Sequence, residues 1–266
     1  MRASLRTDFF DLPRPRVIAH RGFSGEYPEN TLPAFHAAEA IGAAYLELDI
    51  HLTRDGEVVV IHDPDLRRVA GTDGLVAEMD LAAVLAADAG RNFSRDGVSF
   101  PFRDKAIRVP TLREVLQACP AQRVIIEIKP KTPDIVRPAL RIVEECAMSR
   151  RVLIASEHHA PLNAVRNLAP AIPTSFSSHE VGLFVMSLAP GANPSTPAGD
   201  ALQIPPEHLS WQLVTPASVA GAHRLGLEVH VWTVDEIPAM RALLTLGVDG
   251  IITNYPSRLL EVLRTP

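Results

Sequence analysis

Short apolar runs alternate with longer amphipathic segments along most of the chain. Eight apolar runs of strand length are typical of a buried parallel sheet, and they lie at Val17–Ala19, Tyr45–Asp49, Val124–Ile128, Val152–Ala155, Pro173–Phe176, Ala201–Ile204, Val229–Thr233 and Gly250–Thr253. Helical patterns separate most of them, at Leu32–Ile41, Leu112–Ala118, Asp134–Met148, Ala160–Leu168, Ser218–Leu225, Glu236–Leu246 and Ser257–Leu263. This α/β alternation predicts a (β/α)₈ TIM barrel as the first choice and an open doubly wound sheet as the second.

Two stretches interrupt this rhythm. Residues 63–110 are long and rich in glycine, and they are expected to form an excursion over the carboxyl face of the barrel after the second strand. Residues Pro190–Gly199 carry proline and glycine repeatedly, which predicts a flexible loop before the sixth strand. The chain length fits one domain over residues 1–266.

A β-hairpin is expected at the end of the second strand. Asp55-Gly56 is a strong two-residue loop signal, and Val58–Ile61 then forms the return arm. With that loop, His62 lies directly across from Asp49 on the same face of the ladder, about 5.5 Å away at Cβ. Glu47 shares the face because side chains alternate along a strand.

Titratable side chains follow three of the predicted strands directly. His20 and Arg21 come after the first strand, Glu47 and Asp49 close the second, and His62 follows the return arm. The carboxyl ends of strands are where α/β proteins carry their active sites. Imidazoles, carboxylates and an arginine together indicate metal-assisted chemistry on a phosphate ester.

Composition narrows the classes of function. The net charge is −5 and no basic run occurs, so nucleic acid is not an expected partner. The apolar run Val181–Ala189 is too short to span a bilayer, and Met1–Pro15 lacks the apolar core of a signal peptide. Cys119 and Cys146 have no metal or redox spacing. A cytoplasmic protein without stable membrane insertion is expected, and no oligomeric state is predicted.

An ordered set of motifs resembles the glycerophosphodiester phosphodiesterase family. The set covers residues 17–256 and consists of His20-Arg21-Gly22, Pro28-Glu29-Asn30-Thr31, Glu47-Leu48-Asp49, Asp55-Gly56, Val59-Val60-Ile61-His62-Asp63, Glu127-Ile128-Lys129, Val231-Trp232-Thr233-Val234 and Gly247-Val248-Asp249-Gly250-Ile251-Ile252-Thr253. The sequence departs from the family at Glu157, where an aromatic residue is frequent, at Asp235, where asparagine is common, and at Asn254, where aspartate is common. None of the three is expected to touch the chemistry, but Glu157 and Asp235 could alter headgroup recognition.

The resemblance implies a (β/α)₈ barrel with a divalent cation. Glu47, Asp49 and Glu127 would hold the cation, and all-oxygen ligation favours Mg²⁺ or Ca²⁺. His20 and His62 would serve as acid and base.

Five further residues have weaker assignments. Arg21 and Lys129 would hold the phosphate, although both could instead only neutralise the carboxylates. Glu29 and Asp63 are expected to orient the reacting groups, and Glu29 could equally belong to a helix cap. Trp232 at a strand end could contact the glycerol moiety.

The implied reaction is hydrolysis of a small glycerophosphodiester to sn-glycerol 3-phosphate and an alcohol. One alternative is a lysophospholipase D on the same fold, which would need an apolar groove from residues 63–110 or from Val181–Ala189. The other is a non-catalytic barrel that binds phosphate esters, and the paired histidines speak against it.

Overall fold

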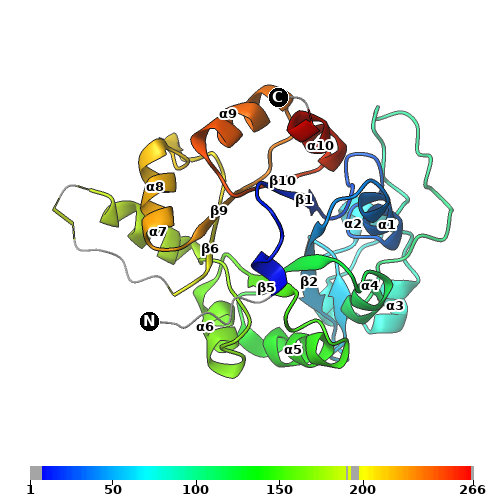
Figure 1. Cartoon of the computed structure of the whole chain (residues 1–266). Helices are drawn as coiled ribbons and strands as arrows, with labels where there is room; N and C mark the ends of the chain where they lie inside the picture. The colour runs from blue at the N-terminus through cyan, green and yellow to red at the C-terminus, as the bar shows by residue number, and fades with distance from the viewer. Residues whose placement is uncertain (1–7, 190, 193–197, 265–266) are drawn as a thin grey trace.

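A ring of parallel strands surrounded by helices forms the centre of the molecule (Figure 1). The computed structural model describes residues 8–189, 191–192 and 198–264. Neighbouring strands follow the order β5-β4-β2-β1-β10-β9-β6. Their bounds are β1 Arg16–His20, β2 Tyr45–Leu52, β4 Arg123–Ile128, β5 Val152–Ala155, β6 Ala201–Ile204, β9 Glu228–Val231 and β10 Gly250–Thr253.

The segment predicted as the fifth barrel strand closes the ring between β5 and β6. Thr174 bridges Ile154 of β5 and Ser175 bridges Ala201 of β6, both in parallel. Ser175 N–H donates to the Ile154 carbonyl at 2.9 Å. The Asp200 carboxylate accepts a hydrogen bond from the Thr174 N–H at 3.0 Å, so a side chain replaces part of the regular backbone hydrogen bonding between strands here. The TIM-barrel prediction is confirmed, and the alternative of an open sheet is wrong.

In the described part of the chain, a helix follows each barrel strand. These helices are α1 Leu32–Ala40, α4 Leu112–Ala118, α5 Val136–Glu145, α6 His159–Leu168, α7 Ser178–Ser187, α8 Pro216–Arg224, α9 Ile237–Leu246 and α10 Pro256–Arg264. Two short 3₁₀ turns accompany them, η1 Asp8–Phe10 and η3 Pro133–Ile135. None of the helices described is long and apolar enough to cross a membrane.

Helix α7 is the barrel helix that the hydrophobic pattern did not predict. Its sequence is apolar almost all round, which hides the helical period. A capping box does mark its start, because Ser177 Oγ accepts the Glu180 N–H and the Glu180 carboxylate accepts the Ser177 N–H. The apolar run that begins at Val181 is therefore part of a barrel helix.

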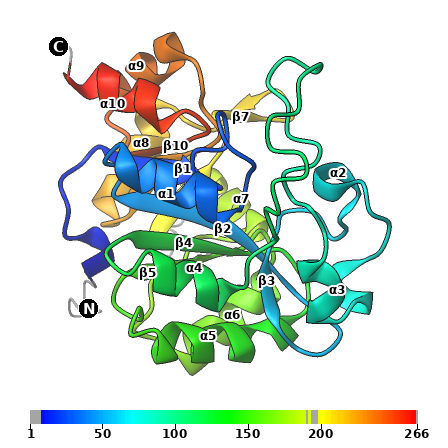
Figure 2. The ribbon, with the colours of Figure 1, turned by 90° about the vertical axis from the view of Figure 1, so that its right-hand side faces the viewer.

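Residues 63–110 form an excursion with a small apolar core of its own. It contains α2 Arg67–Ala70, η2 Val76–Glu78 and α3 Leu81–Leu85, and it lies on the side where β2 ends (Figure 2). Leu66, Val76 and Val84 are fully buried in that core together with Val59 of the hairpin. The loop Pro190–Gly199 falls largely outside the described residues, with only 191–192 and 198–199 inside them.

The hairpin register differs by one residue from the prediction. Strand β3, Val58–Val60, pairs with β2 so that Ile50 faces Val60, and the Ile61 N–H donates to the Asp49 carbonyl at 2.9 Å. The loop has three residues rather than two, closed by Thr53 N–H on the Glu57 carbonyl, with Gly56 at φ +85°. Asp49 is therefore opposite Ile61, and the predicted pairing of Asp49 with His62 is wrong.

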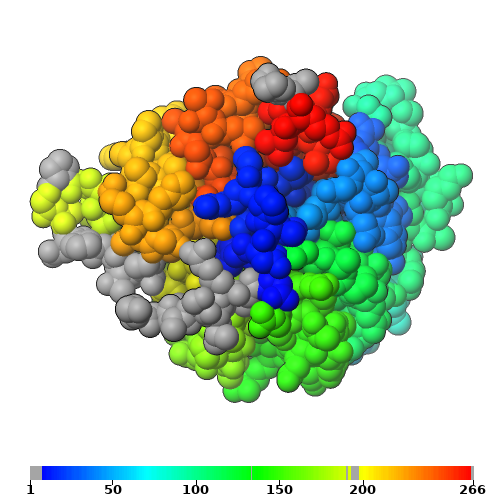
Figure 3. Space-filling model, in the orientation of Figure 1, coloured from blue at the N-terminus to red at the C-terminus, as the bar shows by residue number. Residues whose placement is uncertain are grey.

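The amino end of the barrel is closed by the segment that precedes β1. Phe9 is fully buried among strand residues that point into the barrel, including Ile18 and Ile252. This segment crosses the centre of the ring on the surface that faces the viewer in Figure 3. Beneath it, Arg16 Nε and Nη2 donate to the Glu228 carboxylate at 2.8 and 2.6 Å, and Arg16 Nη1 donates to the Tyr45 hydroxyl at 2.8 Å.

Replacing Arg16 by Met should destabilise the barrel strongly. Arg16 is only 2% exposed, so its loss leaves the Glu228 carboxylate buried with one partner fewer. We expect the free energy of unfolding to fall by about 3–5 kcal/mol in urea titrations. The double variant Arg16→Met/Glu228→Leu should recover at least half of the loss, and a double variant as unstable as Arg16→Met would contradict this account.

Two further measurements test the role of Arg16: a control variant at an exposed arginine, and the dependence of stability on pH. Arg150→Met, which removes a surface ion pair with Asp8, should leave the urea midpoint almost unchanged. Burial alone would raise the pKa of Glu228, but hydrogen bonds from His230 and Arg16 outweigh it and hold that pKa at about 2. The stabilisation is therefore complete above the unfolded pKa of 4.5 and is lost as the pH falls toward about 2. Arg16→Met should weaken that pH dependence.

Candidate active site

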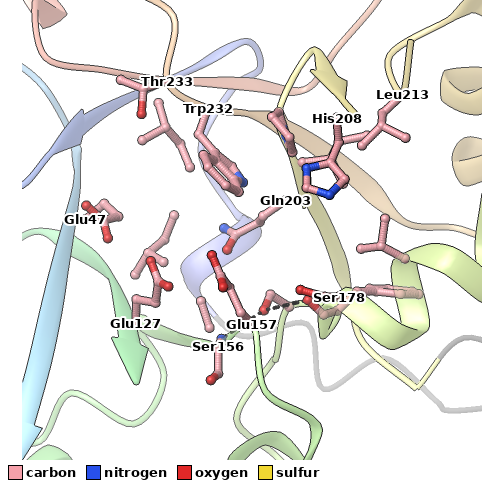
Figure 4. A pocket seen from close by; sticks show the side chains of 18 of the residues that line it. Glu47, Glu127, Ser156, Glu157, Ser178, Gln203, His208, Leu213, Trp232 and Thr233 are labelled. Atoms are coloured by element: carbon pink, nitrogen blue, oxygen red, sulfur yellow. Dashed lines mark hydrogen bonds between the residues drawn. The ribbon is translucent and has the colours of Figure 1, made fainter. Parts of the chain in front are cut away.

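The register of three neighbouring strands brings the candidate residues together at the carboxyl end of the barrel. His20 of β1 is the register partner of Glu47 in β2, and Asp49 of β2 is the partner of Glu127 in β4. Adjacent partners in a parallel sheet carry their side chains next to one another. His20, Glu47 and Glu127 line a cavity of about 560 Å³, into which Glu47 and Glu127 point in Figure 4, whereas Asp49 is fully buried beside them.

Three carboxylates are crowded together at this end of the barrel, two of them lining the cavity. One ligand oxygen from each of Glu47, Asp49 and Glu127 lies within 4.8 Å of the others. Burial, followed by the charges of Asp49 and Glu127, raises the pKa of Glu47 well above its usual value. Burial also raises the pKa of Glu127, whereas Lys129 and Arg21 outweigh burial at Asp49 and lower its pKa. The cluster therefore carries more negative charge than its surroundings compensate.

Arg21 and Lys129 both bind to this carboxylate cluster. Lys129 Nζ lies 3.0 Å from Asp49 Oδ1 and 2.9 Å from Glu127 Oε1. Arg21, at φ +55°, turns its backbone N–H toward Glu47 Oε2 at 3.0 Å and its Nε toward Asp49 Oδ2 at 3.1 Å. In this structure the side chains of Arg21 and Lys129 thus neutralise carboxylates, which is one of the two roles that the sequence allowed, the other being contact with the phosphate.

Asn30 orients Asp49 and was not assigned a function from the sequence. Its Nδ2 donates to Asp49 Oδ2 at 2.8 Å, and its Oδ1 accepts the Asp49 N–H at 3.3 Å. Asn30 is buried and adopts φ +56°, a conformation that asparagine tolerates better than most residues. The sequence signal that could have identified Asn30 as a site residue was its place between Glu29 and Thr31 in the family motif.

His20 is held by two residues at which the sequence departs from the family. Its Nδ1 lies 2.7 Å from Asn254 Oδ1, and Asn254 Nδ2 donates to Asp235 Oδ2 at 2.7 Å. Asn254 thus contacts a candidate catalytic residue directly, and Asp235 is linked to it through Asn254, which the sequence did not predict. Burial, followed by the charge of Arg21, lowers the pKa of His20 to about 4.

His62 reaches the same cavity although its predicted register is wrong. The regular ladder ends at Val60, and the chain bends away from β2 before it reaches His62. His51 Nε2 contacts the His62 carbonyl at 3.0 Å, so this histidine of β2 fixes the backbone there. His62 Nδ1 lies 2.6 Å from Asp63 Oδ1.

Arg68 of α2 connects both orienting carboxylates, which the sequence did not predict. Its guanidinium donates to Glu29 at 2.7 Å and to Asp63 at 2.6 Å. Glu29 also accepts from Arg21 Nη1 at 2.9 Å, so it orients Arg21 rather than His20. Burial would raise the pKa of Asp63, but the hydrogen bonds from Arg68 and His62 lower it to about 2.

The wall of the cavity away from the carboxylates is largely apolar, although Ser178 and His208 also line it. It is built by Val181 and Val185 of α7 and by the small hairpin of β7 Glu207–His208 and β8 Trp211–Gln212. Trp232 projects into the space between this wall and Glu127 (Figure 4). At the rim, Met186 and Trp211 are each 71% exposed, an unusual position for large apolar side chains.

The carboxylate cluster fits a hard divalent cation. Asp49 Oδ1 is buried and accepts no well-aligned hydrogen bond from the described residues, although Lys129 is close. Three converging carboxylate oxygens with raised pKa values at two of the groups are the donor set that Mg²⁺ or Ca²⁺ prefers. Glu47, Asp49 and Glu127 can therefore serve as protein ligands, with Asn30 and Arg21 holding Asp49 in place.

Comparisons with known proteins agree with this geometry. The sequence profile of the Glycerophosphoryl diester phosphodiesterase family matches residues 20–258. The chain is 32% identical to the "Glycerophosphodiester phosphodiesterase" of Caldanaerobacter subterraneus, over 93% of this chain and 97% of that protein. It is 26% identical to the "Lysophospholipase D GDPD1" of Mus musculus, over 93% of this chain and 86% of that protein.

A solved structure extends the similarity to three dimensions. The crystal structure of a Silicibacter pomeroyi protein that carries the same family name superimposes with a TM-score of 0.80. It is 32% identical to this chain and covers 95% of each chain. Because the family profile spans nearly all of the barrel and the strand-end residues meet in one cavity, this chain belongs to the glycerophosphoryl diester phosphodiesterase family and is a phosphoric diester hydrolase.

Proposed function

We propose that this chain hydrolyses glycerophosphodiesters to sn-glycerol 3-phosphate and an alcohol. The observation that carries the proposal is the meeting of two imidazoles, three carboxylates and two cationic side chains at one end of a single cavity. A barrel that only bound phosphate esters would need the cations but would have no use for two histidines with fixed ring orientations. The expected cytoplasmic location stays a prediction.

Glu47, Asp49 and Glu127 are proposed to hold a Mg²⁺ or Ca²⁺ ion. A cation there polarises the phosphoryl oxygens and lowers the barrier for attack at phosphorus. The side chains of Arg21 and Lys129 stand beside the same carboxylates, at distances of about 3 Å. We propose that both also contact the phosphate, where they would stabilise the charge that develops on its oxygens.

His20 and His62 are proposed to exchange protons with the attacking and leaving oxygens. Each ring is fixed through Nδ1, His20 by Asn254 and His62 by Asp63, so each offers Nε2 for proton transfer. Arg68 keeps Asp63 in place and Glu29 keeps Arg21 in place. Trp232 is proposed to contact the glycerol moiety, because its indole lies in the cavity beside the carboxylates.

Removing divalent metal should abolish hydrolysis of glycerophosphocholine, and Mg²⁺ or Ca²⁺ should restore it. Glu47→Gln, Asp49→Asn and Glu127→Gln should each lower kcat by about 10²-fold or more, because each removes one charged ligand. The metal should also raise the melting temperature of the wild type but not of these variants. Glu57→Gln, at an exposed position of the hairpin, is the matched control and should behave like the wild type. Full activity after complete chelation would refute the metal proposal.

The two histidines should prove equally necessary. His20→Ala and His62→Ala should each lower kcat by about 10²-fold or more, the usual scale of acid–base catalysis. The double variant should be little worse than either single variant, because residues that act as one unit are not additive. His36→Ala, on the outer surface of α1, should keep wild-type kcat. Near-normal turnover in either single variant would remove that histidine from the mechanism.

A second candidate function is hydrolysis of lysophospholipids. The observation that favours it is the continuity of the cavity, which runs from the carboxylates to the apolar wall of α7 and the β7–β8 hairpin. The mouse relative is named a lysophospholipase D. We propose that an acyl chain attached to the glycerol would lie along Val181, Val185 and Trp211. The required apolar groove would then come from α7, which includes the Val181–Ala189 run, rather than from residues 63–110.

Substitutions at the exposed rim should separate the two substrates. Met186→Ser/Trp211→Ser should lower kcat/KM for lysophosphatidylcholine by about tenfold, which corresponds to about 1.4 kcal/mol of lost apolar contact. The same variant should hydrolyse glycerophosphocholine at the wild-type rate, because that substrate has no acyl chain. Leu168→Ser, an exposed apolar residue at the other end of the barrel, is the control and should change neither. Equal losses on both substrates would argue against an acyl site.

A further inference from the structure

A short chain of hydrogen bonds ends on the ring of His20. Asp235 lies between β9 and α9, and its carboxylate accepts three donors from the end of β10. These donors are Thr253 Oγ1 at 3.0 Å, the Asn254 N–H at 2.8 Å and Asn254 Nδ2 at 2.7 Å. Asn254 Oδ1 in turn contacts His20 Nδ1 at 2.7 Å and accepts from Ser24 Oγ at 2.8 Å.

The direction of every bond in this chain follows from Asp235. An ionised carboxylate only accepts hydrogen bonds, so the NH₂ group of Asn254 must face it. The carbonyl oxygen of the same amide then faces His20, and a carbonyl oxygen also only accepts. His20 Nδ1 must therefore carry the proton, which leaves a lone pair on Nε2. That Nε2 lies inside the cavity, 3.9 Å from Glu47 Oε2.

We propose that Asp235 is a positioning residue that selects the Nδ1–H tautomer of His20 through Asn254. This inference rests on the proposed hydrolysis, in which His20 then starts the reaction as the proton acceptor. The attacking oxygen gives its proton to His20 Nε2 while it forms a bond to phosphorus. The bond from phosphorus to the leaving oxygen breaks, and that oxygen takes a proton from His62. Both histidines regain their starting states by proton exchange with water.

The orientation of the Asn254 amide is the element that Asp235 controls. Without a carboxylate at position 235, the amide can turn over and direct Nδ2 at His20. His20 Nδ1 would then have to accept, the proton would move to Nε2, and the ring could no longer take a proton from the nucleophile. The catalytic penalty of a wrong histidine tautomer is large even where the geometry is unchanged.

Exchanging the two side chains provides a rescue test. Asp235→Asn should lower kcat about tenfold or more with KM within about threefold, because the histidine is still present but in the wrong tautomer. Asn254→Asp should also lower kcat, because it places two carboxylates 2.7 Å apart. In Asp235→Asn/Asn254→Asp the hydrogen bond between the two residues reverses direction, and the carboxylate at 254 again accepts from His20 Nδ1. Its kcat should return to within about fivefold of the wild type.

The tautomer itself can be read without any substrate. In ¹⁵N-histidine-labelled protein, long-range ¹H–¹⁵N correlation distinguishes Nδ1–H from Nε2–H, and His20→Gln identifies the His20 signals. The wild type and the exchange variant should show Nδ1–H, and Asp235→Asn should show Nε2–H or a mixture. Asn254→Ala offers a second test of the same shift if Asp235→Asn fails to fold. Asn167→Asp, which adds a charge at an exposed site on α6, should change neither signal nor kcat.

Two results would overturn the proposal. One is an unchanged Nδ1–H signal of His20 in both Asp235→Asn and Asn254→Ala. The other is an exchange variant no more active than the weaker single variant. If the wild type hydrolyses no glycerophosphodiester, the proposed function fails, and the tautomer measurement alone then decides whether Asp235 controls His20.

Discussion

The register between β1, β2 and β4 is the constraint on which the active site depends. It makes His20 a neighbour of Glu47 and Asp49 a neighbour of Glu127, so backbone hydrogen bonds bring four candidate site residues together before any side-chain contact orients them. Parallel strands in a closed barrel cannot shift singly, because each is paired on both sides. The precision of the site is thus a property of the sheet, and the loops above it only complete the arrangement.

Charge balance is the second requirement of this arrangement. Buried carboxylates repel one another strongly, and Lys129 and Arg21 offset part of that repulsion without removing it. The pKa of Glu47 is raised while that of Asp49 is lowered, so neighbouring carboxyl groups of the same strand differ in their affinity for protons. Asn30 contributes a neutral donor to Asp49, which holds that group in place without adding further charge.

Much of this architecture could be predicted from the sequence, because strand ends and short apolar runs are local signals. The bounds of β5, β6, β10 and α4 agree residue for residue with the pattern. The hairpin register could not be predicted reliably, since two- and three-residue loops with Asp-Gly look alike in sequence. In the structure Asp55 accepts hydrogen bonds from Thr53 within the loop and from Leu81 of α3, and the second of these contacts forms only on folding. Arg68, Asp235 and Asn254 were assigned no part in the chemistry because most of their partners are distant in the sequence: Glu29 lies 39 positions from Arg68, Asp235 lies 19 from Asn254, and His20 lies 234 from Asn254.

The position of Arg68 has a consequence for how the enzyme loses activity. This one side chain joins the excursion, through α2, to Glu29 and Asp63 beside the catalytic groups. The excursion packs around a small core that is distinct from the barrel core and shared with Val59 of the hairpin, so we expect it to open as a separate cooperative unit. Opening of that unit would release the supports of Arg21 and His62 while the barrel stayed folded. The activity would then depend on the local stability of residues 63–110. On heating, the enzyme would lose activity at a lower temperature than the one at which the barrel unfolds.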